Sequence, residues 1–297
     1  VIMKSRKIVS ALVAFAVAGI TTFGAPNMVN AAARTINVPD NAFETKLIAL
    51  GHDTGALDNY VPLANVRDLT SLDLSNAQIT NYEGLASFAS LTSLNISGNT
   101  TVTSLNSWMN IYSDTLPLPK SIRTINLSGA TRLTSLTIAG NENSKLGLTG
   151  VTLTGNTALT DLSVYDTALS SIDVSALTTL SYLNLQSNKL TALNVASNTA
   201  LTDLYVWGNQ LSTMDLSSLT VLEGFSAGNN KLTSLTLGST KLQSISLSGN
   251  MLTSFSLKDV PELLSLNLSS NRLTCLTLSG LPNLANLTVS NNFLSSL

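Results

Sequence analysis

The fold is decided by the stretch LSYLNLQSNKL, residues 180–190, in which leucine occupies the first, fourth, sixth and eleventh places and asparagine the ninth. The same pattern, with other apolar residues at some leucine places, begins again at Leu201, Leu222, Leu242, Leu263 and Leu284. Counted from Leu159, the spacings are 21, 21, 21, 20, 21 and 21 residues. Chance does not hold a spacing this constant over six steps, so this part of the chain repeats one structural unit.

A fixed period in this range predicts a leucine-rich-repeat solenoid. Within each unit the leucines alternate with polar residues, which is the two-residue period of a strand with one buried face. One unit has no core of its own, so it must bury its leucines against the units before and after it. We therefore expect an α/β, strand-rich solenoid, a horseshoe or rod, with a parallel β-sheet on its concave face.

The recurring asparagine follows each strand, at the point where the chain bends. Its side chain can pair with backbone groups of its own coil and the next one, so identical asparagines would stack into a ladder. An unpaired amide at such a bend would cost roughly 1–3 kcal/mol. We therefore interpret these asparagines as structural rather than ligand-binding.

Each period also holds a second apolar phrase that lacks the regular asparagine, as in Leu211-Met214-Leu216. This phrase should line the opposite wall of the coil. Ser, Thr and β-branched residues fill the places between its apolar residues, and these are weak helix formers. We expect extended or short 3₁₀ structure on this wall rather than regular α-helices.

The composition of the 297 residues bounds the class of protein. Hydrophobic residues make up 44% of the chain, which is enough for a long core, whereas only 11% are charged and 5% aromatic. The net charge is −2 and there is no basic patch, which argues against nucleic acid and anionic membranes as partners. The single cysteine, Cys275, excludes an internal disulfide framework.

The N-terminus has the order of a secretory signal peptide. A basic start at residues 4–7 is followed by an apolar run over residues 8–23 and by small residues up to Ala31. This order predicts a signal peptide over residues 1–31, cleaved after Ala31 or Ala33. The alternative is an uncleaved anchor, but the run is shorter than the roughly 20 residues of a span. No later stretch could span a membrane, so we expect a secreted or cell-surface protein.

Residues 32–68 do not follow the repeat and are predicted to be an N-terminal cap. Residues 42–50 favour a short helix, with Asp40 as its N-cap and Glu44 in its first turn, where a negative charge suits the helix dipole. A solenoid needs its first coil covered. We therefore expect this segment to cover the first coil.

Residues 69–297 are predicted to form the solenoid, with about eleven coils and an incomplete last one. The first coils start at Leu69 and Leu91, in one series with Leu133 and Leu159. Between them, residues 108–120 are irregular, and Ile122-Ile125-Leu127 is interpreted as the second wall of one degraded coil. A five-residue loop around residues 142–145 accounts for the longer step from Leu133 to Leu159.

The leader, the cap opening NVPDNAF at residues 37–43 and the 21–22-residue coils resemble the internalin-type leucine-rich-repeat proteins of bacteria. The resemblance covers about residues 35–297. It implies a surface or secreted protein that binds proteins of a host or a neighbouring cell through its concave strand face. The chain departs from that pattern at residues 291–297, which stop part-way round a coil, and we expect a natural or cloning truncation there.

Related repeat proteins often carry a calcium-loop-like segment between cap and first coil. The corresponding residues 53–60 have Gly55 and Leu57 at places where such a loop needs oxygen ligands. We therefore expect no calcium there, and no other metal or cofactor. His52 is the only histidine, so zinc and histidine-based catalysis lack partners.

Three successive coils break the Ser/Thr-rich pattern of the predicted concave face and give it four of the chain's eight Tyr and Trp residues. The candidate ligand-binding residues are Asp161, Tyr165, Tyr182, Gln186, Asp203, Tyr205, Trp207 and Glu223. Aromatic rings with flanking acids and amides are favoured at binding hot spots, and exposed rings in a row also suit sugar stacking. The alternative is that the rings only pack across neighbouring strands.

No enzyme is expected. Asp161 and Asp203 lie two coils apart, about 10 Å at strand spacing, and a glycosidase pair at roughly 5–9.5 Å would need a pocket that an open strand wall does not offer. Cys275 is far in sequence from His52, so a Cys–His pair is not expected. The sequence favours a binder of a protein partner, acting in adhesion or in contact with host or neighbouring cells. The alternatives are a carbohydrate-binding module that uses the same rings, or a structural spacer or envelope-assembly rod.

Overall fold

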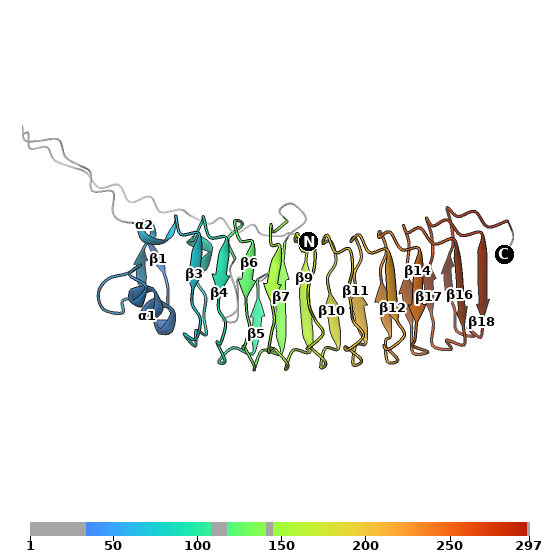
Figure 1. The fold of residues 1–297 in the computed structure, drawn as a ribbon, viewed down its shortest axis with the longest axis horizontal. Coiled ribbons are helices and arrows are strands. Elements are labelled where there is room, and N and C mark those ends of the chain that lie inside the picture. The colour runs from blue at the N-terminus through green and yellow to red at the C-terminus, as the bar shows by residue number, and fades with distance from the viewer. Residues whose placement is uncertain (1–33, 108–117, 141–144, 296–297) are drawn as a thin grey trace, which may run out of the picture. The chain divides into compact units, whose positions relative to one another are not determined.

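The computed structural model describes residues 34–107, 118–140 and 145–295. The predicted signal peptide, the irregular residues 108–117 and most of the loop at 142–145 lie outside these ranges. From Ala33 onward the chain forms one unit, and its coils are stacked in sequence order (Figure 1). The predicted leucine-rich-repeat solenoid is confirmed.

One wall of the solenoid is a parallel sheet of nine strands, ordered β19-β17-β15-β13-β11-β10-β9-β7-β5. Its strands are β5 (Ser104–Asn106), β7 (Ser135–Ala139), β9 (Asp161–Tyr165), β10 (Tyr182–Asn184), β11 (Asp203–Tyr205), β13 (Gly224–Ser226), β15 (Ser244–Ser246), β17 (Ser265–Asn267) and β19 (Asn286–Thr288). Equivalent leucines pair in register, as Leu183 does with Leu162 and Leu204. These leucines are fully buried and belong to the core, whereas the residues on either side of them in the strands are partly or fully exposed.

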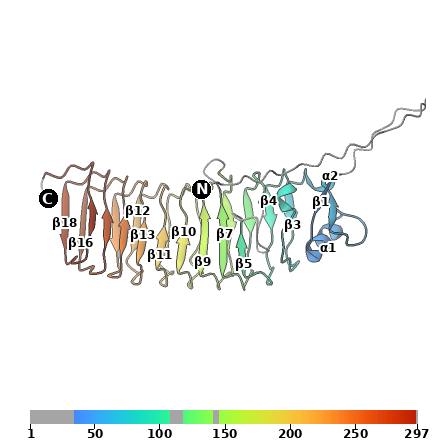
Figure 2. The same ribbon diagram turned by 180° about the vertical axis from the view of Figure 1, so that it is seen from behind.

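The opposite wall is also extended, as predicted, but it is divided into separate sheets. A four-stranded parallel sheet consists of β3 (Ser71–Asp73), β4 (Ser93–Asn95), β6 (Thr124–Asn126) and β8 (Gly150–Thr152). Further along, β12 (Thr213–Leu216) pairs with β14 (Ser234–Leu237), and β16 (Ser254–Lys258) pairs with β18 (Cys275–Ser279). Figure 2 shows the same stack of coils from behind.

The predicted wall assignment of the first coils is wrong. Leu94 of the expected first wall pairs with Ile125 of the expected second wall, and both belong to the four-stranded sheet. The nine-stranded sheet begins instead at Leu105, which pairs with Leu136. The two walls carry the same LxxLxL phrase, and the step from Leu94 to Ile125 is 31 residues, so a count of 21-residue periods assigned the phrases to the wrong wall.

Asparagines at the bends form the predicted ladder along the nine-stranded sheet. Asn209 is buried, and its Nδ2 donates to the carbonyls of Val206 in its own coil (3.0 Å) and Leu185 in the preceding coil (2.8 Å). Its Oδ1 accepts from the Leu190 N–H at 3.0 Å. Asn188, Asn230, Asn250, Asn271 and Asn292 repeat this arrangement. The partner is the preceding coil, not the following one as expected.

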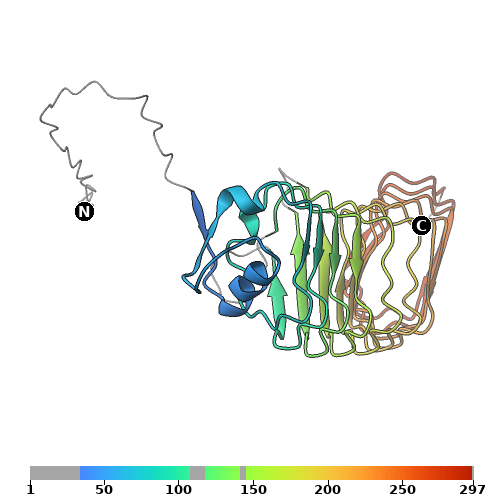
Figure 3. The same ribbon diagram turned by 60° about the vertical axis from the view of Figure 1, so that its left-hand side comes forward.

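The N-terminal cap pairs β1 (Thr35–Asn37) with β2 (Tyr60–Pro62) antiparallel and contains α1 (Asn41–Ala49) and α2 (Leu63–Val66). Figure 3 shows this end of the unit in front of the coils. The short 3₁₀ helix η1 (Leu85–Ser87) follows in the first coil. The predicted helix is confirmed to within one residue, and Phe43 and Leu47 on it are fully buried.

Asp40 joins the cap to the first coil. Its Oδ1 accepts from the N–H groups of Ala42 and Phe43, as predicted for an N-cap, at 2.9 and 3.0 Å. Its Oδ2 accepts from Thr80 N–H, Thr80 Oγ1 and Asn81 N–H at 2.9, 2.7 and 3.0 Å. Burial by itself would raise the pKa of Asp40, but these hydrogen bonds together lower it.

Glu44 is fully buried rather than only a partner of the helix dipole. Its carboxylate accepts from the N–H groups of Asp58 (2.8 Å) and Asn59 (3.1 Å), and so fixes the loop that returns to β2. Buried charges need such hydrogen bonds to be tolerated. Two acids thus hold the cap together: Asp40 at the N-terminus of α1 and Glu44 in its first turn.

Candidate binding face

All candidate residues except Glu223 lie on the solvent side of three adjacent coils, within or just after β9, β10 and β11 of the nine-stranded sheet. Side chains two residues apart on a strand share one face, so each of these coils presents three side chains, of which two or three are candidates. The parallel register sorts them into rows across the strands. The rows show which candidates are neighbours and which are not.

The first row places an aromatic ring between two carboxylates. Tyr182 pairs with Asp161 on one side and with Asp203 on the other. Neighbouring strands are about 4.8 Å apart, so both acids flank the same tyrosine. Thr160 Oγ1 donates to Asp161 Oδ2 at 2.6 Å, and Thr202 Oγ1 donates to Asp203 Oδ2 at 2.9 Å. Each threonine thus restricts the movement of the acid beside it.

The second row consists of Ser163, Asn184 and Tyr205. The ring of Tyr205 packs against the ring of Tyr182 in the first row. Their ring centroids are 5.6 Å apart with an interplanar angle of 47°, which is the favourable tilted geometry of an aromatic pair. The hydroxyl of Tyr205 donates to Asp203 Oδ1 at 3.0 Å. The expected alternative of cross-strand ring packing is therefore present for these two rings, and it positions them beside the acids.

Burial and nearby negative charge raise the pKa values of Tyr182 and Tyr205. Burial is the main cause that raises the pKa of Tyr205 to about 12, followed by its hydrogen bond to Asp203 and the charge of that carboxylate. Burial also raises the pKa of Tyr182, and Asp203 and Asp161 raise it further, against a lowering by a hydrogen bond with Asn184. Both phenols are therefore neutral at physiological pH.

The third row contains Tyr165, Gln186 and Trp207, whose backbones are joined where Asp166 N–H donates to the Gln186 carbonyl and Ser187 N–H to the Trp207 carbonyl. Trp207 is 38% exposed and makes no ring contact with the described tyrosines. Tyr165 is half-buried, and burial raises its pKa, with smaller contributions from Asp166 and Tyr182. This row extends the aromatic surface beyond the Tyr182–Tyr205 pair.

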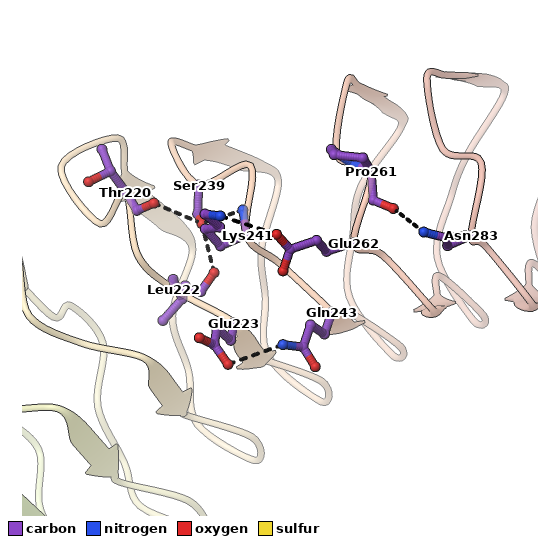
Figure 4. Close-up of polar contacts among 9 residues, drawn as sticks. All are labelled: Thr220, Leu222, Glu223, Ser239, Lys241, Gln243, Pro261, Glu262 and Asn283. Atoms are coloured by element: carbon purple, nitrogen blue, oxygen red, sulfur yellow. Dashed lines mark hydrogen bonds and ion pairs between the residues drawn. The ribbon is translucent and has the colours of Figure 1, made fainter.

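Glu223 lies apart from these rows. It is exposed at the start of the next strand, and its Oε2 accepts from Gln243 Nε2 at 3.1 Å (Figure 4). Its side chain therefore turns toward the following coil rather than toward the tyrosine pair. The structure brings together Asp161, Tyr182, Asp203 and Tyr205, but not Glu223.

Two glycines that sequence reasoning overlooked leave room for this cluster. A Cβ on Gly224 would lie 2.6 Å from Asp203 Oδ1 and 3.3 Å from the Tyr205 hydroxyl. A Cβ on Gly228 would lie 2.8 Å from Trp207 Cδ1. Gly224 and Gly228 occupy the places of Asp203 and Trp207 in the following coil. Glycine at these places is the sequence signal that could have pointed to them.

The arrangement suits binding rather than catalysis. It offers a neutral, half-buried aromatic pair beside two fixed carboxylates on an open sheet. Among the described residues, no group of three or more His, Cys, Asp or Glu could hold a metal ion. No helix in the described ranges has the length and apolar character needed to cross a bilayer.

Residues 39–166 match the family model of the endo-beta-N-acetylglucosaminidase EndoS LRR domain, which is less than half of the chain. The repeated pattern and the stacked coils make this chain a leucine-rich-repeat protein by fold. A comparison with curated proteins finds no match. The functional domain of InlJ from Listeria monocytogenes is 23% identical, with 90% of this chain and 73% of that chain covered and a TM-score of 0.45.

Two further solved leucine-rich-repeat structures are similar. The internalin InlF from Listeria monocytogenes is 20% identical, over 90% of this chain and 95% of its own, with a TM-score of 0.43. The ectodomain of the plant receptor kinase GASSHO1/SCHENGEN3 from Arabidopsis thaliana, solved in complex with CASPARIAN STRIP INTEGRITY FACTOR 2, is 18% identical over 76% and 35%, with a TM-score of 0.44.

Proposed function

We propose that this internalin-like chain is an exported or cell-surface protein that binds a protein partner through the solvent face of β9, β10 and β11, in adhesion or in contact with host or neighbouring cells. The observation that carries the proposal is the row Asp161–Tyr182–Asp203 with Tyr205 packed against it. Hot spots at protein interfaces favour such aromatic residues.

The chemistry of the row selects a basic side chain of the partner. A guanidinium or ammonium group over the face of Tyr182 gains a cation–π attraction of roughly 0.5–2 kcal/mol. Asp161 and Asp203 can then accept its N–H groups from either side. Trp207, the most exposed ring of the set, would contribute apolar contact area next to this site.

The proposal includes no catalytic step. The candidate acids lie on an open strand wall, and their contacts are to threonine and tyrosine hydroxyls rather than to a general base. The binding energy would come from burying the rings and from pairing the acids. Charged residues at such a face chiefly set partner choice and association rate.

The test is a peptide array of random sequences probed with the mature chain, compared with the double variant Tyr205→Ala, Trp207→Ala. We expect the bound peptides to be enriched in Arg or Lys, and the affinity for a selected peptide to fall by more than about 2 kcal/mol in the double variant. Tyr60→Ala is the matched control, because Tyr60 is 52% exposed but lies in the cap. An unchanged affinity in the double variant, with intact folding, would refute the proposal.

The carbohydrate alternative uses the same rings and is separated by a glycan array. The tilt of 47° between Tyr182 and Tyr205 means that these two rings do not form one flat platform for a sugar, which favours the protein partner. The spacer or assembly-rod alternative predicts concentration-dependent self-association. Size-exclusion chromatography with light scattering distinguishes it from a monomeric binder.

A further inference from the structure

The second wall of the solenoid is split between β14 and β16. β14 is hydrogen-bonded only to β12, and β16 only to β18, so the two pairs form separate sheets. Just before the split, Met251 N–H donates to the Leu232 carbonyl at 2.9 Å. Within the described chain, no backbone hydrogen bond joins residues 234–237 to residues 254–258.

The split coincides with the one short step of the regular repeats. From Leu232 to Leu252 the period is 20 residues, whereas the steps before and after it are 21. On the nine-stranded wall the same two coils remain paired, since Gly224 aligns with Ser244. The coils therefore keep their stacking on one wall and separate on the other.

A cleft of about 570 Å³ occupies the split, within the range of roughly 300–1,000 Å³ of ligand-binding clefts. Its apolar lining includes Leu235 and Leu237, which are partly exposed. Their register partners on β12, Met214 and Leu216, are buried. The cleft thus leaves two apolar side chains partly exposed whose counterparts on β12 are buried.

The cleft lies between two contacts that join the coils. At one end is the bond between Met251 and Leu232. Beyond the other end, Lys241 Nζ and Glu262 Oε1 form an ion pair at 3.2 Å (Figure 4). Between them lies a slot that runs along the strand direction, with one strand edge on each side.

We infer that this slot binds an extended peptide segment of a protein partner as an additional β-strand. The two facing edges each leave backbone N–H and C=O groups without a strand partner, and extended peptides are recognised by adding to such edges. Successive side chains of a strand point to opposite faces. Apolar residues at alternate positions of the segment would therefore contact Leu235, Leu237 and Phe255, while the residues between them would face solvent.

The lining also defines the character of the segment. Outside the apolar residues it consists mainly of Ser and Thr, and Lys258 is its single charged residue. A neutral segment with alternating apolar and hydroxyl side chains matches it. A second cleft of about 270 Å³ near Leu153 and Leu177 has a regular strand on one side only, β8, and so lacks the two edges on which the inference rests.

The test uses a labelled synthetic peptide with the sequence of residues 232–239, which naturally forms a strand of this wall, and measures fluorescence anisotropy. A second peptide with proline at the places of Ser234 and Thr236 cannot donate hydrogen bonds there. Ser256→Arg adds a long side chain to the lining of the slot. Thr191→Arg makes the same kind of change at an exposed place on the same wall, two coils away from β14.

We expect saturable binding to the wild type and to Thr191→Arg, binding at least tenfold weaker to Ser256→Arg, and none of the proline peptide. Cys275, the chain's single cysteine, is exposed and lines the slot. Alkylation with a bulky maleimide should therefore block binding to the wild type but not to Cys275→Ser. Absence of saturable binding, or binding that survives both alkylation and Ser256→Arg, would overturn the inference. If Ser256→Arg does not fold, the alkylation experiment decides.

Discussion

The hydroxyl of Tyr205 donates to Asp203 Oδ1 at 3.0 Å. The two residues are two positions apart on β11 and therefore share one face of the strand. The bond holds a carboxylate in the row that contains Tyr182, because Asp203 and Tyr182 are register partners. It also opposes ionisation of the phenol, since a phenolate beside the carboxylate would be repelled. The acid therefore helps to keep the phenol of Tyr205 protonated.

This relationship predicts a stability change at alkaline pH. The pKa of Tyr205 is raised from 10 to about 12, so the neutral phenol stabilises the fold fully below pH about 10, and that contribution is lost as the pH rises through about 12. Urea unfolding of wild type and Tyr205→Phe should show a difference that is constant below pH about 10 and shrinks above it. A difference that grows with pH would contradict the assignment.

Gly224→Ser should break the hydrogen bond between Tyr205 and Asp203 without unfolding the coil. The added Cβ would lie 2.6 Å from Asp203 Oδ1, which is the end of a side chain that can turn away. We expect the pKa of Tyr205, followed by phenolate absorbance, to fall below about 12, while burial keeps it above its ordinary value of about 10. Gly150→Ser is the control, because a Cβ there meets only Thr124 Cγ2 at 3.5 Å. An unshifted Tyr205 titration in Gly224→Ser would show that the bond survives.

Asn209→Ala should be strongly destabilising. The change leaves the buried Leu190 N–H without its side-chain acceptor, and the carbonyls of Leu185 and Val206 each lose one of two asparagine donors. A buried polar group left unpaired costs roughly 1–3 kcal/mol, so we expect a loss of at least about 2 kcal/mol in urea unfolding. Asn194→Ala, which removes only an exposed bond to Ala196 N–H, should cost less than about 1 kcal/mol.

Asp40→Ala should loosen the cap in a pH-dependent way. The loss of the N-cap alone costs roughly 0.5–2 kcal/mol, and Thr80 and Asn81 lose their acceptor as well. Because the pKa of Asp40 is lowered below 3.8, its contribution is present above pH about 3.8 and is lost as the pH falls through the folded-state pKa. Wild type and variant should therefore converge in stability under acid conditions, and a constant difference would contradict this explanation.

The repeat period and the alternation of apolar and polar residues were sufficient to predict the solenoid and the presence of its asparagine ladder, and Asp40 and Glu44 were sufficient to predict the capped helix. These features depend on local spacing, which the sequence displays directly. The wall to which Leu94 belongs could not be predicted, because both walls use the same phrase. Only hydrogen bonding between coils decides that Leu94 aligns with Ile125.

On the candidate face, the 21-residue spacing puts Tyr182 in the coil between those of Asp161 and Asp203, and the strand register pairs it with both acids. It could not predict that Tyr205 turns toward Asp203 or that Glu223 turns away to Gln243, since side-chain directions depend on neighbouring contacts. The split between β14 and β16 also escaped prediction. The single 20-residue step was visible, but the wall that absorbs it is set by the stacking of both sheets.

The direction of the asparagine contacts has a consequence for how the chain is made. The Leu190 N–H is satisfied by Asn209, which leaves the ribosome 19 residues later, and the same delay recurs between Leu211 and Asn230. Each bend therefore stays incomplete until its successor has been synthesised. Folding during translation should advance toward the C-terminus in steps of one coil, with the newest coil always the least ordered.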